Sequence, residues 1–122
     1  MDERRTLRIS EAVREEISEL VGFELDDPRL AGVDVTEVHL SHDGRHANVK
    51  VAMRGDERQQ KAALEALEHA SNYLRRQLAS RLSLRHVPEL HFDLDKHADV
   101  ENRIDFLLKR TKKSRGRSEN SP

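Results

Sequence analysis

Apolar residues near the start of the chain recur with the spacing of one helical face. They are Leu7, Ile9, Val13, Ile17 and Leu20. These intervals are close to the i, i+4 and i+7 or i+8 pattern of an amphipathic helix. A glycine just past the last periodic position commonly ends a helix, so Gly22 is expected to end this one. The sequence therefore predicts a first helix, followed by an irregular connection over residues 24–32.

Two segments of alternating apolar residues follow this connection. The first has Val33 and Val35 in one phase and Val38 and Leu40 in the other, which predicts a β-bulge near Thr36. Asp43-Gly44 is a hairpin turn signal. The returning strand places four residues inward: Ala47, Val49, Val51 and Met53. The two segments therefore predict an antiparallel hairpin.

The remaining pattern is helical, then extended, then helical again. One helix starts around Glu57, a second continues from Tyr73 to Leu82, and Pro88 closes that region. A short strand has Leu90, Phe92 and Leu94, and a last helix has Val100, Ile104, Leu107 and Leu108. The order is α-β-β-α-α-β with a short closing helix. This order predicts a single α+β domain, in which a three-stranded sheet has helices on one face.

The composition excludes several classes of protein. The chain has no cysteine, so disulfides and thiolate metal sites are excluded. No apolar run approaches the roughly 20 residues of a membrane span, and residues 1–8 lack the apolar stretch of a signal peptide. We therefore expect a cytoplasmic protein without a membrane partner. The apolar residues are all used by one core, which favours a monomer.

The net charge of −1 conceals a basic C-terminal end. Residues 109–122 contain one acid, Glu119, and six basic residues: Lys109, Arg110, Lys112, Lys113, Arg115 and Arg117. With hardly any apolar residue, this segment is predicted to be a disordered tail on a domain of residues 1–108. A mobile polycation would add salt-dependent affinity for an RNA backbone. The alternative is a terminus that only improves solubility.

The segment from Tyr73 to Pro88 contains no acid. Its cationic or titratable candidates for RNA binding are Arg75, Arg76, Arg81, Arg85 and His86. Each arginine can offer its planar guanidinium to phosphate oxygens. A helical wheel places Arg75 and Arg76 in solvent, and it places the stem of Arg81 at the edge of the core. A solvated helix face without a ligand is the alternative.

Ala70-Ser71-Asn72 interrupts the helical region with weak helix formers. A kink at this point would expose backbone N–H groups at Ser71 and Asn72, at the start of the arginine-bearing helix. Such groups form an anion site. An unbroken helix with two polar surface residues is the alternative. The sequence leaves both open.

Catalytic and metal chemistry have weaker support. Asp93 and Asp95 share one face of a strand near His97, a spacing that could hold a divalent ion. No third ligand or nucleophile accompanies them, so an exposed pair of carboxylates is the favoured interpretation. The seven histidines show no zinc-site spacing. We expect no cofactor, no resident metal, no small-molecule substrate and no enzymatic activity.

Several short motifs together are similar to the ribosome-binding factor A family. They are Asp27-Pro28-Arg29-Leu30, Leu40-Ser41-His42-Asp43, Ala70-Ser71-Asn72-Tyr73-Leu74-Arg75, Arg81-Leu82-Ser83-Leu84-Arg85, Val87-Pro88-Glu89-Leu90 and Phe92-Asp93-Leu94-Asp95. The motifs follow the family's order and spacing over roughly residues 4–108. Each motif alone is weak, and the ordered set is strong.

The resemblance implies a type II KH fold in which an Ala-x-Gly kink replaces the usual GxxG loop. Asn72 stands at the glycine position, where it would need a left-handed conformation. The resemblance also implies a non-enzymatic factor that binds the small (30S) ribosomal subunit and its 16S rRNA late in maturation. Such a factor aids 5′-end processing, matters most in the cold, and leaves with the help of an assembly GTPase or initiation factor 3. A KH-like binder of another structured RNA and a protein–protein adaptor remain alternatives.

Overall fold

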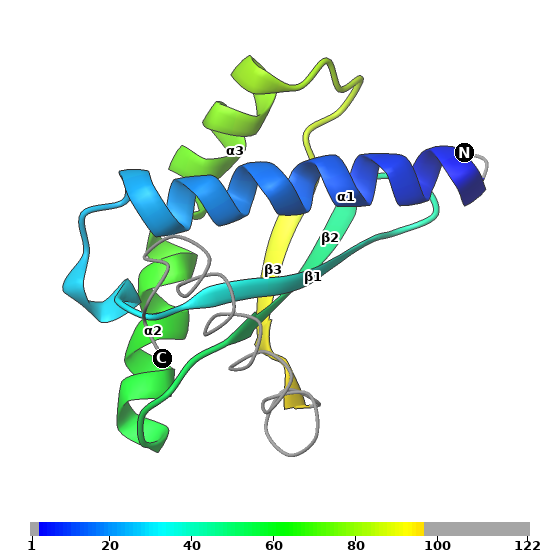
Figure 1. Cartoon of the computed structure of the whole chain (residues 1–122). Helices are drawn as coiled ribbons and strands as arrows, with labels where there is room; N and C mark the ends of the chain where they lie inside the picture. Colours follow the sequence, from blue (N-terminus) through cyan, green and yellow to red (C-terminus); the bar gives the residue numbers. More distant parts are fainter. Residues whose placement is uncertain (1–2, 97–122) are drawn as a thin grey trace, which may run out of the picture.

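The computed structural model describes residues 3–96 (Figure 1). The main elements are α1 (Glu3–Glu19), β1 (Asp34–Leu40), β2 (His46–Ala52), α2 (Glu57–His69), α3 (Ser71–Arg81) and β3 (Glu89–Leu94). This arrangement confirms the predicted α-β-β-α-α-β order and the α+β class. The expected last helix, the basic tail and the boundary between residues 108 and 109 lie outside the described residues.

The three strands form one sheet in the order β1-β2-β3, so β2 is central. β1 and β2 pair as the predicted antiparallel hairpin, and the register shifts between Val35 and Glu37, which confirms the bulge near Thr36. β3 pairs with β2 in parallel, after the chain has crossed over through α2 and α3. The hairpin turn contains Gly44 at φ 76°, a left-handed conformation that favours glycine.

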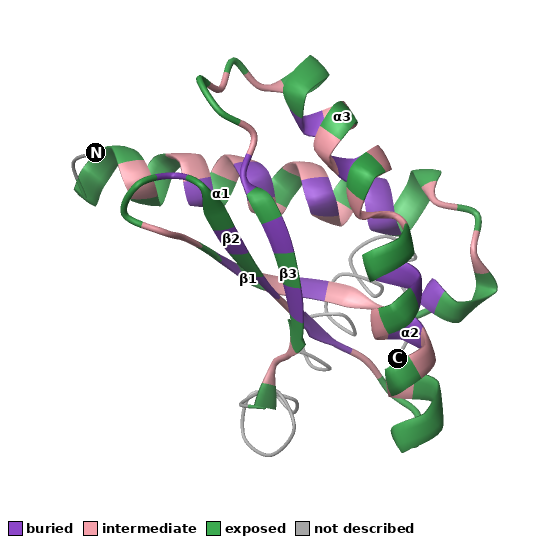
Figure 2. Ribbon diagram, turned by 180° about the vertical axis from the view of Figure 1, so that it is seen from behind, coloured by how far each residue is buried: buried purple, intermediate pink, exposed green. Residues whose placement is uncertain are grey.

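Within residues 3–96, the helices cover one face of the sheet. Val35, Val38, Val49 and Phe92 are buried with side chains of all three helices in a single core, and Figure 1 shows α1 crossing the sheet. The residues that alternate with them form the other face, where Figure 2 shows exposed positions along the strands. The exposed members are Glu37, His39, His46, Asn48, Glu89, His91 and Asp93. The other face, as far as residues 3–96 go, is therefore a polar sheet surface.

The end of the first helix differs from the expectation. Gly22 does not end α1; the regular helix ends at Glu19 and continues as a wide π-helical turn, η1 (Leu20–Glu24). The Leu25 N–H donates to the Leu20 carbonyl at 2.8 Å. Successive residues of a regular helix point about 100° apart, whereas the wider turn lets both Leu20 and Val21 face the core. Burial of two adjacent apolar residues thus decides the helix end.

The start of α2 is fixed by a reciprocal cap. The carboxylate of Asp56 accepts from the Gln59 N–H at 2.8 Å, and the Gln59 side chain accepts from the Asp56 N–H at 2.9 Å. This capping box satisfies two backbone donors that the first turn leaves without helical partners. Gly55 precedes it at φ 126°, where a Cβ atom would lie 2.7 Å from Gln59 Oε1. The local sequence therefore sets the direction from which the chain enters α2 and α3.

Candidate nucleic-acid interface

The predicted interruption between the two central helices is present and lies at Ala70. α2 ends at His69, α3 begins at Ser71, and Ala70 between them has φ −86° and ψ −2°. Its N–H is shared between the carbonyls of Ala66 and Leu67, at 3.0 and 3.1 Å. Asn72 does not adopt the left-handed conformation that an Ala-x-Gly kink implies for this position, because it lies in the first turn of α3. The hydrogen bond that Ala70 shares between two carbonyls therefore ends α2 without a residue in the left-handed conformation.

The start of α3 is suited to an anion. Ser71 is half-buried and Asn72 is exposed, and neither a side-chain cap nor an acidic residue occupies this first turn. The aligned peptide dipoles give a helix N-terminus partial positive charge. The structure thus keeps both predicted residues at the end of a helix where a phosphate group would be favoured.

Arg75 does not face solvent as the helical wheel suggests. It is half-buried, and its guanidinium donates from Nε to the Pro88 carbonyl and from Nη2 to the Val87 carbonyl, both at 3.1 Å. These bonds join α3 to the residues immediately before β3. Arg75 therefore has a structural role that the helical wheel does not indicate, because backbone acceptors 12 and 13 residues later occupy its donors.

Arg81 is also occupied, in this case by acids from the other end of the chain. Its guanidinium contacts both carboxylate oxygens of Glu24 at 2.6 and 2.8 Å, and it reaches Glu16 at 3.3 Å. The hydrogen bonds to Glu24 raise the pKa of Arg81 above its usual range. Residues 73–88 contain no acid, yet α1 and η1 supply two. Arg81 therefore joins the end of α3 to α1 and η1. The two carboxylates neutralise the positive charge that it could offer to RNA.

The remaining candidates keep their charge available. Arg76, Arg85 and His86 are exposed, and within residues 3–96 their side chains make no hydrogen bond or ion pair. Arg76 follows Asn72 by four residues, so both lie on one face of α3. Arg85 and His86 lie in the connection between α3 and β3. We call Ser71, Asn72, Arg76, Arg85 and His86 the α3 surface.

The strand carboxylates have separate partners. Asp93 lies 3.8 Å from the ammonium of Lys50, and Asp95 accepts from the Thr36 hydroxyl at 2.7 Å. The Asp95 N–H also donates to the Val51 carbonyl at 2.8 Å, just beyond the end of β3. This arrangement supports the interpretation of both acids as parts of the fold. His97 lies outside the described residues.

The sequence gives only weak signals that Arg75 and Arg81 have partners within the fold. Glu16 and Glu24 are separated from Arg81 by 65 and 57 residues, so no local spacing indicates the ion pairs. No helix within residues 3–96 is long and apolar enough to cross a membrane. Arg76, Arg85 and His86 lie on the surface of the domain, within α3 and in the connection that follows it.

Comparisons with known proteins point to one family. The family model of ribosome-binding factor A matches residues 5–108. A ribosome-binding factor A of Solibacter usitatus is 65% identical over 120 residues, covering 98% of each chain. That of Thermomicrobium roseum is 43% identical over 117 residues, covering 96% of this chain and 91% of the relative.

Solved structures give the same answer. The crystal structure of ribosome-binding factor A from Thermus thermophilus has a TM-score of 0.67 and 31% identity, and the match covers 73% of this chain and 94% of that one. A homology model of the Thermus thermophilus factor, fitted into a cryo-EM map of a 30S–RbfA complex, has a TM-score of 0.61 and 32% identity. That match covers 74% of this chain and 94% of the fitted one. The chain belongs to the ribosome-binding factor A family.

Proposed function

We propose that this protein is a non-catalytic assembly factor that binds the small ribosomal subunit and its 16S rRNA during late maturation, including processing of the 16S rRNA 5′ end. The observation that carries the proposal is the exposed charge of Arg76 within α3 and of Arg85 just after it, together with an α3 N-terminus that no side chain caps. The fit of the Thermus thermophilus relative into a map of a 30S–RbfA complex supports the choice of partner.

The α3 surface would recognise folded rRNA by the positions of its phosphates. Arginine side chains and a helix N-terminus contact phosphates and carry little base information. Stacking on aromatic side chains contributes little, because the chain has one tyrosine, three phenylalanines and no tryptophan. The protein would therefore hold an immature rRNA conformation by shape and charge while neighbouring helices settle.

The basic residues from Lys109 to Arg117 would add a second, less specific contact. Six cations in a short segment bind phosphates by releasing counterions, so their contribution falls steeply with salt. Arg75 and Arg81, by contrast, would act through the fold, because they join α3 to the residues before β3 and to α1 and η1. The proposed RNA contacts are thus narrower on the domain than the sequence alone suggests.

Binding to purified immature small subunits at several salt concentrations tests the proposal. The test variant is Arg76→Glu/Arg85→Glu, and the matched control is Arg58→Glu/Lys61→Glu, two exposed cations in the first turns of α2. Arg58 and Lys61 lie in α2, whereas Arg76 lies in α3, beyond the interruption at Ala70. Both variants change the net charge equally, so a general electrostatic effect would weaken both.

We expect the test variant to lose most of its affinity and the control to retain it. Loss of two phosphate contacts should reduce the slope of log K against log salt by about 1.4–1.8. Complementation of a deletion strain by each variant, with the 16S rRNA 5′ end mapped, reports on processing. Equal weakening of both variants would contradict the site. If an equal mass of unrelated structured RNA displaces the subunits, the protein has no preference for subunits. That outcome would contradict the choice of partner.

A further inference from the structure

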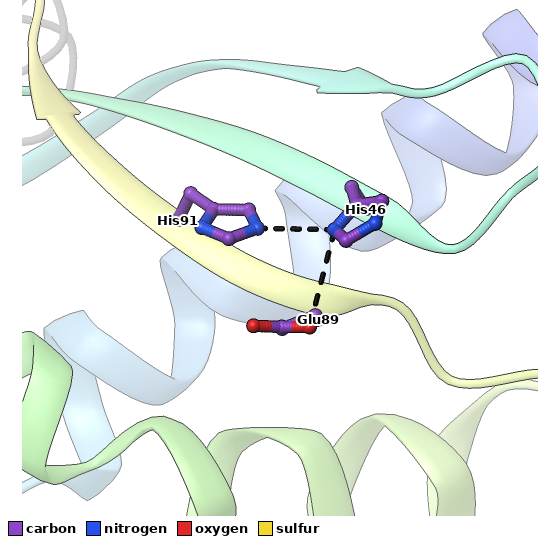
Figure 3. A group of neighbouring side chains, drawn as sticks. All are labelled: His46, Glu89 and His91. Atoms are coloured by element: carbon purple, nitrogen blue, oxygen red, sulfur yellow. Dashed lines mark hydrogen bonds and ion pairs between the residues drawn. The ribbon is translucent and has the colours of Figure 1, made fainter.

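The open face of the sheet brings together three side chains with metal-binding chemistry. His46 lies at the start of β2, and Glu89 and His91 lie at the start of β3 (Figure 3). Their ligand atoms all lie within 4.8 Å of one another, and all three residues are exposed. These residues lie on the strands, whereas the α3 surface lies on α3 and on the connection that leads into β3. We propose that His46, Glu89 and His91 form a binding site for a divalent transition metal ion such as Zn²⁺.

The distances suit one ion. His46 Nδ1 and His91 Nε2 are 3.1 Å apart. Two nitrogens that are each about 2.0–2.1 Å from a zinc ion lie about 3.3–3.4 Å apart at the tetrahedral angle. His46 Nδ1 is 4.0 Å from Glu89 Oε2, so this oxygen needs to move closer to the two nitrogens to share an ion with them. The Glu89 side chain is 61% exposed and is able to make that movement.

The backbone beneath the three side chains is fixed by the sheet. His46 is directly opposite Glu89 in the parallel register of β2 and β3, and the Glu89 N–H donates to the Arg45 carbonyl at 2.8 Å. Glu89 and His91 are two residues apart on one strand, so they project from the same face. The backbone of the ligands is therefore positioned by regular structure, and little backbone freedom is lost when they bind an ion.

The ligand set selects the class of ion. Two imidazoles and one carboxylate suit Zn²⁺ and its neighbours, whereas Mg²⁺ and Ca²⁺ prefer oxygen ligands throughout. Three protein ligands leave a fourth position for water. Lys50 is the lysine of β2, and it is engaged by Asp93 at 3.8 Å. A bound ion would join the start of the edge strand β3 to the central strand β2.

A natural control lies on the same face. His39 and Glu37 are two residues apart on β1, as His91 and Glu89 are on β3, with a nitrogen–oxygen distance of 3.2 Å. Within residues 3–96, His46, Glu89 and His91 are the one group of three possible ligands close enough to share an ion. The pair on β1 lacks a third ligand. His39 and His91 both pair with Asn48 from opposite sides. Two strand spacings, about 9.6 Å, therefore separate their backbones.

Isothermal titration of the full-length, tag-free protein with Zn²⁺ tests the site. We expect one ion per chain, with binding weakened at least about tenfold in His46→Ala/His91→Ala and retained in His39→Ala. Glu89→Gln should weaken binding as well and so reports on the third ligand. Mg²⁺ should neither bind measurably nor compete.

Thermal unfolding of the same variants gives a second readout. Zn²⁺ should raise the Tm of the wild type and of His39→Ala, and it should leave the Tm of the double variant unchanged. Matching circular dichroism spectra confirm that all variants are folded. Absence of saturable Zn²⁺ binding by the wild type, or equal binding by wild type and double variant, overturns the proposal. Equally tight binding of Mg²⁺ overturns the assigned class of ion.

Discussion

Arg75 provides the sharpest test of how the structure divides the arginines of α3. Replacement by methionine keeps a long apolar side chain and removes both hydrogen bonds to the carbonyls of Val87 and Pro88. A hydrogen bond made by a charged group contributes about 1.5–3 kcal/mol to stability. Because Arg75 is only half-buried, each bond is expected to contribute about 1–1.5 kcal/mol, at or slightly below the lower end of this range. Two bonds then predict a loss of about 2–3 kcal/mol in the free energy of unfolding.

Arg76→Met is the matched control for this change. Arg76 is the next residue of the same helix, it is exposed, and its side chain makes no hydrogen bond or ion pair within residues 3–96. Surface substitutions of this kind change the free energy of unfolding by about 0.5 kcal/mol or less. The structure therefore predicts a large difference in stability between neighbouring arginine-to-methionine variants.

Urea unfolding followed by circular dichroism measures the difference. Both variants should keep the wild-type m value, while the midpoint of Arg75→Met falls. In thermal unfolding, about 1 kcal/mol shifts the Tm of a domain of this size by about 4–8 °C, so a decrease of roughly 10–20 °C is expected. Subunit binding below the midpoint should be weakened by Arg76→Met more than by Arg75→Met. Equal stability of the two variants, with equal loss of subunit binding, would refute the structural role of Arg75.

Two further predictions concern local electrostatics. Asp56→Ala removes half of the capping box at the start of α2 and should lower the free energy of unfolding by about 0.5–2 kcal/mol in urea titrations, whereas Asp56→Ser should retain most of it. Hydrogen bonds from the guanidinium and N–H of Arg29 lower the pKa of Asp27, so below about pH 4 the folded state binds fewer protons than the unfolded state, and stability is lost as the pH falls through the folded pKa. Asp27→Asn should flatten this part of an acid unfolding curve, and an unchanged curve would contradict the assignment.

The secondary structure could be predicted because each signal is local. Val49 and Val51 alternate with polar residues, and this period of two specifies a half-buried strand. The change of phase around Thr36 specifies the bulge for the same reason. Gly22 was misjudged because a propensity for helix ends competes with burial of Leu20 and Val21, and only the packed core shows which effect is larger.

The site could be predicted in part. The sequence identifies the arginine-rich segment and the interruption before it, and the structure keeps Arg76 and Arg85 exposed within that segment. The sequence could not show that the donors of Arg75 and Arg81 are already bonded to other parts of the fold. An acid-free segment has no local competitor for its arginines, but folding brings carbonyls and carboxylates to them from elsewhere in the chain.

The sequence by itself determined the order of elements, the class of fold and the family, because these depend on periodicity and on motifs read along the chain. Tertiary structure alone decided which charges remain available to a ligand and which ligand atoms meet. His46 and His91 are 45 residues apart in the chain, yet their nitrogens lie 3.1 Å apart. The parallel register of β2 and β3 brings them together, and that register is set by the crossover through α2 and α3 and by burial of the opposite face.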